Sequence, residues 1–211
     1  MKRRVVLVHG LWYGPVSMGL MALRLESMGL DCHRFGYPTL SKSVASNARA
    51  LFNFSRELDV DQLDFVGHSL GGLVILRMFD ELTGLPPGRN VLLGSPVRGS
   101  DVASRLVELK VARPLIGQAR TALERGFSHA PSGRDTGVIA GTRGVGLGRV
   151  LSNLDGPHDG TIRVAETRLD DATDTLQLPV SHTGLVLSRE VSEAVARFLE
   201  TGRFRSDPPR P

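Results

Sequence analysis

The sequence predicts an α/β fold in which a mostly parallel sheet is covered by helices on both faces. Short aliphatic runs alternate along the chain with longer segments whose apolar residues recur at helical spacing. Because parallel strands need a crossover between them, usually a helix, this alternation favours a parallel sheet over hairpins. The length of 211 residues and the hydrophobic content of 41% fit one globular domain. We expect that domain to span residues 1–204 and the proline-rich residues 205–211 to form a loose tail.

The expected strands are short runs of β-branched and aliphatic residues that end near glycine or proline. Continuous apolar runs of this kind are typical of parallel strands that are buried on both faces. The first follows a charged start and could be mistaken for part of a signal peptide, but it is too short and no small-residue cleavage site follows it. The strands are predicted at residues 5–8, 32–35, 63–66, 90–93 and 136–141.

The expected helices carry apolar residues at intervals of three and four. The first stops at Gly29, a glycine suited to a helix C-cap. The segment 101–126 is helical in pattern but interrupted at Pro114, and it is either a cover over the site or a crossover helix pair packed on the sheet. The loop that contains Gly144, Gly146 and Gly148 lacks dinucleotide-binding spacing and is interpreted as a flexible connection. The other helices are predicted at residues 18–28, 44–58, 73–81 and 191–199.

The residues Gly67-His68-Ser69-Leu70-Gly71-Gly72 lie between an expected strand and an expected helix. A G-x-S-x-G motif in this setting is typical of a nucleophile elbow, in which a sharp turn exposes the serine hydroxyl. The alternative is a structural strand-to-helix turn. The N–H group of Leu70 would lie at the start of the helix, where unpaired donors favour a developing oxyanion. The pattern therefore predicts a nucleophile, Ser69, next to a charge stabiliser.

The loop His9-Gly10-Leu11-Trp12-Tyr13-Gly14 follows the first expected strand. Open α/β sheets bind ligands at the carboxyl ends of their strands. The N–H group of Leu11 is therefore the second candidate oxyanion donor, and the alternative is an ordinary glycine turn. Trp12 and Tyr13 either line a substrate pocket or serve as packing residues.

An activated serine needs a histidine base, and the base needs an acid. If the chain order is serine, acid, histidine, the candidate bases are His129, His158 and His182. We favour His182, which lies in a loop just before the last helix. Asp159 is the favoured acid, in an Asp-Gly turn that would otherwise be only a turn, and Asp155 is the runner-up.

Four separated motifs resemble the α/β-hydrolase superfamily, specifically its small lipases and esterases. They are the first strand ending in His-Gly, the GHSLGG elbow, the GSPVRGS loop with Val97 where a histidine is usual, and the late DGTI turn followed by a histidine. The resemblance implies an α/β-hydrolase fold with a minimal lid and a catalytic triad of Ser69, Asp159 and His182. It also implies that Leu11 and Leu70 supply the oxyanion hole, and that carboxylic esters are cleaved through an acyl-enzyme.

The same triad would serve an acyltransferase, a thioesterase or an amidase, and a non-catalytic ligand-binding protein can share the fold. A membrane-surface lipase is a further alternative. We expect a small-molecule ester or lipid substrate with a short or medium acyl chain, and neither a cofactor nor a metal, since no HExxH pair or cysteine–histidine cluster is present.

The charge and cysteine content bear on partners and location. The 26 basic and 22 acidic residues leave a net charge of +4 spread along the chain, which does not favour nucleic acid binding. No run approaches the roughly 20 apolar residues of a membrane span. The single cysteine, Cys32, is interpreted as a small buried hydrophobe and fits a reducing compartment. A cytoplasmic protein without stable membrane insertion is therefore expected.

Overall fold

The computed structural model describes residues 2–100, 117–119, 126–127, 129–144 and 155–205. Most of the segment 101–126 expected to cover the site lies outside these residues. So do Gly146, Gly148 and most of the expected tail. None of the described helices is both long and apolar enough to cross a bilayer.

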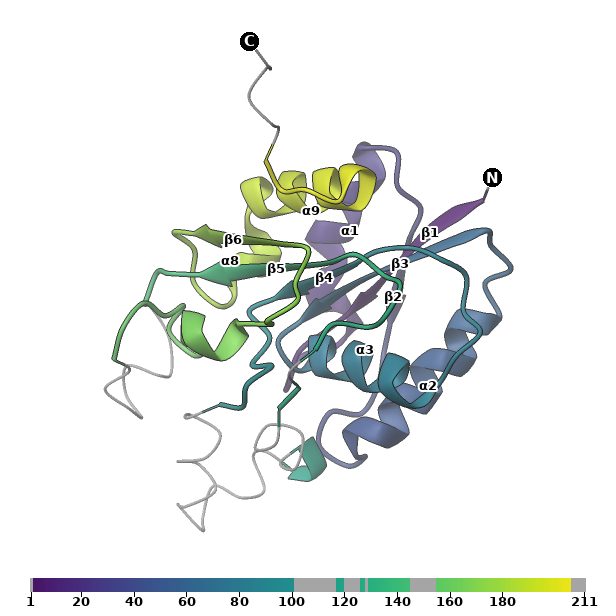
Figure 1. The fold of residues 1–211 in the computed structure, drawn as a ribbon, viewed down its shortest axis with the longest axis horizontal. Helices are drawn as coiled ribbons and strands as arrows, with labels where there is room; N and C mark the ends of the chain where they lie inside the picture. Colours follow the sequence, from purple (N-terminus) through teal and green to yellow (C-terminus); the bar gives the residue numbers. More distant parts are fainter. Residues whose placement is uncertain (1, 101–116, 120–125, 128, 145–154, 206–211) are drawn as a thin grey trace.

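Six parallel strands form one sheet in the order β2-β1-β3-β4-β5-β6 (Figure 1). This confirms the predicted parallel sheet. The central strands are almost fully buried, whereas the two edge strands have mixed burial. The strands are β1 (Arg3–Val8), β2 (Cys32–Phe35), β3 (Gln62–His68), β4 (Asn90–Leu93), β5 (Thr136–Gly141) and β6 (Asp174–Leu178).

Helices cover both faces of the sheet, as predicted (Figure 1). One face carries α2 (Val44–Arg56) and α3 (Leu70–Glu81), and the other carries α1 (Gly19–Ser27), α8 (Gly184–Leu187) and α9 (Arg189–Thr201). Three short 3₁₀ helices complete the described elements: η1 (Pro15–Met18), η3 (Gly117–Ala119) and η4 (Val164–Thr167).

Local sequence explains where the helices begin and end. Ser43 caps α2 by accepting a hydrogen bond from the N–H of Ser46, at 3.2 Å. After α1, Gly29 has φ +87°, and the Leu30 N–H donates to the Leu25 carbonyl at 3.1 Å. A glycine therefore ends α1 in the left-handed conformation, as predicted.

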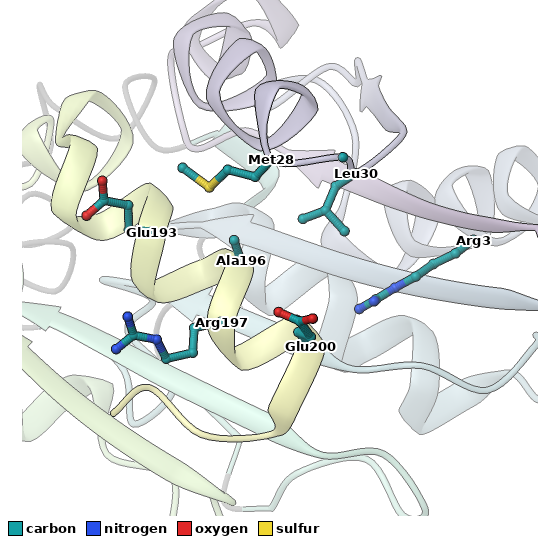
Figure 2. A pocket seen from close by; sticks show the side chains of 8 residues that line it. Arg3, Met28, Leu30, Glu193, Ala196, Arg197 and Glu200 are labelled. Atoms are coloured by element: carbon teal, nitrogen blue, oxygen red, sulfur yellow. The ribbon is translucent and has the colours of Figure 1, made fainter. Parts of the chain in front are cut away.

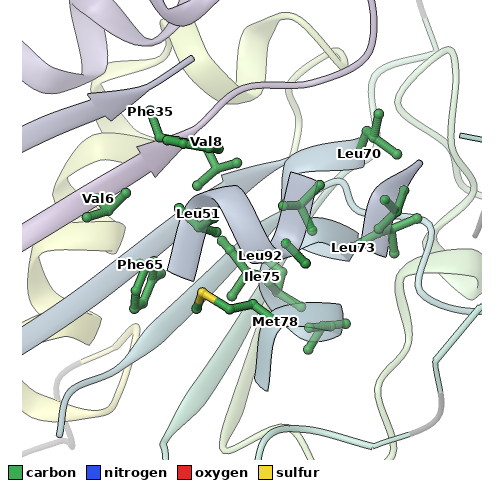
Figure 3. Close-up of a cluster of buried hydrophobic side chains, with 14 of the residues drawn as sticks. Val6, Val8, Phe35, Leu51, Phe65, Leu70, Leu73, Ile75, Met78 and Leu92 are labelled. Atoms are coloured by element: carbon green, nitrogen blue, oxygen red, sulfur yellow. The ribbon is translucent and has the colours of Figure 1, made fainter. Parts of the chain in front are cut away.

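Each face of the sheet has its own hydrophobic core, because alternate side chains of a strand point to opposite sides. In β1, Val6 and Val8 pack toward α2 and α3, whereas Val5 and Leu7 pack toward α1 and α9. Figure 3 shows the first core, in which side chains of α3 such as Leu73 and Met78 gather against the strands. In the described part of the chain, helices cover both faces of the sheet, so a site formed by the strands themselves would lie at their ends and in the loops that follow them.

Cys32 departs from the expectation of a fully buried hydrophobe. It lies at the start of edge strand β2, is partly exposed, and packs against the core beneath α1 and α9. Partial burial, together with the nearby carboxylates of Glu26 and Asp31, raises the pKa of its thiol to about 12. The cysteine therefore stays a neutral thiol at physiological pH.

Candidate active site

The loops that carry the predicted site residues follow the carboxyl ends of the strands. Ser69 directly follows β3, and its N–H donates to the carbonyl of Leu93, the last residue of β4, at 2.9 Å. The Gly94 N–H in turn donates to Ile139 of β5, also at 2.9 Å. The elbow and the two neighbouring strand ends are thus joined at one edge of the sheet.

The elbow has the strained geometry that its motif predicts. Ser69 has φ 53° and ψ −120°, a conformation that costs energy for any residue with a side chain. The glycines around it are required by close backbone contacts. A Cβ on Gly67 would lie 2.6 Å from the Gly72 nitrogen, and one on Gly71 would lie 2.2 Å from the Val8 carbonyl oxygen. The turn between β3 and α3 can therefore form only with small residues at these positions.

Asp159 and His182, predicted as acid and base, are brought together. The Nδ1–H of His182 donates to Oδ2 of Asp159 at 2.7 Å, and the His182 backbone N–H donates to the Asp159 carbonyl at 2.9 Å. The other carboxylate oxygen accepts from the N–H groups of Thr161 and Ile162, at 2.9 and 2.7 Å. Asp159 is 1% exposed, so these bonds replace its hydration. With Nδ1 protonated, Nε2 of His182 is left as the basic nitrogen.

The His182 loop packs against the elbow through His68, the residue before Ser69. Nε2 of His68 lies 3.0 Å from the His182 carbonyl oxygen, and the two ring centroids are 4.7 Å apart. Within the described part of the chain, the Ser69 hydroxyl makes no direct hydrogen bond to His182. Such bonds are often long before substrate binds. The structure thus bonds Asp159 directly to His182. His182 is connected to the elbow through His68, the residue before Ser69.

Two glycines that sequence reasoning did not single out make room for the acid–histidine pair. Gly94 has φ +54°, and a Cβ there would lie 3.0 Å from Oδ2 of Asp159 and 3.3 Å from Nδ1 of His182. A Cβ on Gly141, the last residue of β5, would lie 2.8 Å from that of Asp159. Gly141 is the last residue of a buried strand and Gly94 directly follows one, and this position is the signal that the sequence offers for them.

The loop after β1 holds the candidate donor Leu11 in a defined orientation. The carbonyl of Gly10 accepts a hydrogen bond from Nδ1–H of His9 at 3.0 Å and one from the Tyr13 N–H at 3.3 Å. Because a peptide unit is planar and trans, the Leu11 N–H points away from that carbonyl. Leu70, the other candidate, is the first residue of α3, where N–H groups have no partner within the helix.

Burial keeps two histidines of this region neutral. His9 is 0% exposed and His68 is 1% exposed, and in each case burial is the main cause of a lowered pKa. For His68 the neighbouring charge of His182 adds to the effect, and the pKa lies well below 6.5. The uncharged imidazole of His68 therefore lies beside the candidate base, His182.

Trp12 and Tyr13 lie at the surface of the same loop. Trp12 is 47% exposed with φ 64°, and Tyr13 is 37% exposed. The Tyr13 hydroxyl lies 3.2 Å from Oγ1 of Thr183, and its ring meets His68 edge-on at 5.9 Å. Tyr13 thus bridges the β1 loop to the His182 loop, while a substrate-lining role for either residue remains a proposal.

The alternative site residues lie in other surroundings. His129 is exposed, and its Nδ1 is 3.7 Å from a carboxylate oxygen of Asp171. The Nδ1 of His158 accepts a hydrogen bond from the Gly160 N–H at 3.1 Å, and Asp155 is exposed. In the described residues, no three His, Cys, Asp or Glu side chains are grouped so that they could hold a metal ion.

A separate groove lies between α1 and α9 (Figure 2). It is lined by arginine and glutamate side chains together with Met28 and Leu30, and Arg3 at the start of β1 contributes to it. Because Arg3 begins β1 and Ser69 follows the end of the parallel strand β3, this groove is at the opposite end of the sheet from the elbow.

Comparison with known proteins was made on the sequence and on the fold. A sequence model described as the alpha/beta hydrolase family matches residues 5–203. No curated protein matches the chain.

Several solved structures share the fold at low sequence identity. A mature lipase of Bacillus licheniformis superposes with a TM-score of 0.72 at 19% identity, over 96% of this chain and 92% of that one. A metagenomic carboxyl esterase gives 0.70 at 20% identity, over 86% of this chain and 64% of that one. The NocB thioesterase domain from the nocardicin cluster gives 0.62 at 20% identity, over 95% of both chains.

Proposed function

The chain belongs to the alpha/beta hydrolase family, and we propose that it is a serine hydrolase that cleaves carboxylic esters through an acyl-enzyme on Ser69. The observation that carries this proposal is a strained Ser69 whose neighbour in the chain, His68, packs on the histidine of a buried Asp159–His182 pair. Backbone strain and a desolvated carboxylate both cost stability and are common at functional sites. A purely structural turn would need neither feature.

In the proposed reaction His182 is the general base. Its Nε2 takes the proton of the Ser69 hydroxyl as the oxygen attacks the ester carbonyl, and it then protonates the leaving alcohol. Asp159 holds the ring in the required tautomer and stabilises the imidazolium. The N–H groups of Leu11 and Leu70 stabilise the tetrahedral oxyanion, each contributing about 3 kcal/mol to lowering the barrier. Water, activated by His182, then hydrolyses the acyl-enzyme.

The structural neighbours support esters as the first substrate class to test, since a lipase and a carboxyl esterase are among them. A thioesterase domain is among them too, so thioester cleavage by the same acyl-serine is the second candidate. We further propose short or medium acyl chains for this protein. A strong preference for emulsified long-chain triglycerides over soluble esters would contradict that part of the proposal.

The test is hydrolysis of p-nitrophenyl esters from acetate to palmitate, together with an acyl-thioester series. The wild type is compared with Ser69→Ala, His182→Ala and, as a matched control, the exposed His129→Ala. We expect a burst and turnover in the wild type and in His129→Ala, and no turnover in the two site variants although they remain folded.

A fluorophosphonate probe separates the remaining outcomes. If no ester or thioester reacts but the probe labels Ser69, the nucleophile is confirmed and the substrate class is wrong. If the folded wild type is neither active nor labelled, the protein is a non-catalytic member of the family.

A further inference from the structure

His68, the residue before Ser69 in the elbow, contacts two other loops that hold proposed catalytic groups: the His182 loop and the loop after β1. Its ring lies against His182 on one side and meets Tyr13 edge-on, with centroid distances of 4.7 and 5.9 Å. A Cβ on Gly10 would lie 3.0 Å from its Nδ1, so the backbone of the oxyanion loop also passes close to the ring. The imidazole is 1% exposed and belongs to the residue next to Ser69.

The hydrogen bond of His68 to His182 fixes which nitrogen carries the proton. A carbonyl oxygen only accepts, so Nε2 of His68, at 3.0 Å from the His182 oxygen, must be protonated. Nδ1 is buried, and no described residue gives it a hydrogen-bond partner. A buried nitrogen without a partner costs free energy, and an apolar side chain could fill the site without that cost. The feature that an apolar side chain could not provide here is the hydrogen bond from Nε2 of His68 to the His182 carbonyl.

That bond completes the restraints on His182. The backbone N–H of His182 and its Nδ1–H are both held by Asp159, at 2.9 and 2.7 Å. The carbonyl of His182 is held by His68. Both backbone polar groups and one ring nitrogen are thus fixed, and Nε2 is left for the substrate and the serine.

We propose that His68 is a positioning residue, whose Nε2–H bond to the His182 carbonyl fixes the base loop on the elbow so that the base stays in line with Ser69. The role of His182 as base rests on the function proposed above. Because His68 directly precedes Ser69, its bond links the base loop to the same turn that holds the nucleophile. His68 is also kept neutral by its burial, so it does not place a second positive charge beside the imidazolium that forms during the reaction.

Two substitutions separate the hydrogen bond from the volume of the ring. His68→Gln places an amide N–H donor near the former Nε2, whereas His68→Met fills similar space without a donor. We expect His68→Met to lower kcat for the best ester about tenfold with KM within about twofold of the wild type, because misplacement of a catalytic group affects the chemical step. We expect His68→Gln to restore kcat to within about twofold of the wild type.

The ¹H NMR signal of the His182 Nδ1 proton provides a readout that does not depend on turnover. A proton bonded to a buried carboxylate is shifted downfield, and Asp159→Asn identifies it by its loss. We expect the signal to be preserved in His68→Gln and to be broadened by exchange in His68→Met. Equal kcat values in the wild type and both variants would overturn the proposal, and so would an equal loss in both variants with the signal unchanged.

The protonation of His68 itself tests the proposal where His68→Met does not fold. In ¹⁵N-labelled wild-type protein, we expect Nε2 of His68 to be protonated and Nδ1 to be bare from pH 6 to pH 8. A proton on Nδ1 instead would refute the bond to His182. If the ¹⁵N result holds but no ester, thioester or fluorophosphonate reacts, the contact is real and the proposed function is the part that fails.

Discussion

Strand β3 carries a buried carboxylate near its amino end and a buried imidazole at its carboxyl end, and the protein surrounds the two groups differently. Asp64 and His68 are 0% and 1% exposed, and both belong to the same central strand. Removing these two polar groups from water is unfavourable unless each finds hydrogen-bond partners. The two ends of the sheet differ in how far such partners are provided, and the proposed site lies at the carboxyl end.

At the amino end the carboxylate is fully paired. Oδ2 of Asp64 lies 2.6 Å from Nε of Arg3, and Oδ1 accepts the backbone N–H of Arg89, also at 2.6 Å. Arg134 stacks over the rings of Phe65 and Phe79 and donates to the carbonyls of Leu63 and Pro86. These bonds join the start of β1 and the loop before β4 to β3, and both oxygens of Asp64 have partners. Among the described residues, Nε of Arg134 and Oδ1 of Asn90 are buried here without a partner.

At the carboxyl end, beside the fully paired Asp159, several polar groups are neutral, strained or incompletely paired. Ser69 has positive φ, and the Nδ1 of His68 and the Oγ of Ser95 are buried without a hydrogen-bond partner among the described residues. Groups of this kind lower stability, and they persist where the arrangement serves another purpose. The comparison therefore predicts that substitutions at the amino end reduce stability, whereas those at the carboxyl end reduce activity.

The largest expected effect is the loss of activity in Asp159→Asn. An asparagine can still accept the N–H groups of Thr161 and Ile162, so the loop should keep its shape. It no longer stabilises the correct tautomer and charge of His182, and we expect kcat to fall about 10⁴-fold with little change in Tm. Steady-state kinetics and thermal unfolding measure the two quantities. The exposed Asp155→Asn serves as the control and should match the wild type; an Asp159→Asn variant with more than about a tenth of wild-type activity would exclude the triad.

The next effect is a loss of stability in Asp64→Ala. The substitution removes the acceptor of the Arg3 Nε–H and of the Arg89 N–H, while the Arg3 guanidinium keeps its bond to the Leu199 carbonyl. We expect the free energy of unfolding to fall by about 3 kcal/mol. Arg3 is partly exposed and can recover some hydration, which limits the cost. Denaturant unfolding measures the change. At a temperature where the variant is folded, its kcat should equal that of the wild type, and a large loss of kcat there would contradict the separation between the two ends.

The stability of the protein should also depend on pH through the buried histidines of the carboxyl end. His9 and His68 have lowered pKa values in the folded state, so below pH 6.5 the unfolded chain binds more protons than the native one. The free energy of unfolding should therefore fall as the pH falls, by about 1.4 kcal/mol per pH unit for each histidine, until the native pKa is reached. Stability is retained above pH 6.5. Unfolding titrations between pH 7 and pH 5 measure the slope, and His68→Gln should reduce it by about one proton; an unchanged slope would show that His68 is not the group involved.

The sequence predicted the parts of this comparison that depend on local pattern. The central strands are continuous apolar runs, and the elbow follows from its glycines and its place between β3 and α3. Edge strand β6 was not predicted because its five residues, Asp-Thr-Leu-Gln-Leu, contain only two apolar side chains and lack the continuous apolar run used to find the other strands. The contacts of His68 with His182 and of Asp64 with Arg3 join residues 114 and 61 positions apart. Such contacts form only when the fold brings distant segments together, so no local sequence motif predicts which residues will be in contact.

The smallest predicted effect concerns Ser95, in the loop after β4. Its hydroxyl is 1% exposed and packs against the first turn of α3, where a Cβ on Gly72 would lie 2.1 Å from it. Because no described residue bonds to this hydroxyl, the free energy lost when it is removed from water is not offset by a hydrogen bond in the folded protein. We expect Ser95→Ala to raise the free energy of unfolding by about 1 kcal/mol.

A second buried serine provides the matched control for Ser95→Ala. Ser192 of α9 is 0% exposed, and its hydroxyl donates to the Ser188 carbonyl at 3.1 Å. Ser192→Ala removes a satisfied hydroxyl and should lower the free energy of unfolding by about 1 kcal/mol. Denaturant unfolding of the two variants should give changes of opposite sign, because the Ser95 hydroxyl is unpaired and the Ser192 hydroxyl is paired. A loss of stability in Ser95→Ala equal to that in Ser192→Ala would mean that the Ser95 hydroxyl makes a stabilising bond, which would leave the Nδ1 of His68 as the unpaired group at the carboxyl end on which the comparison rests.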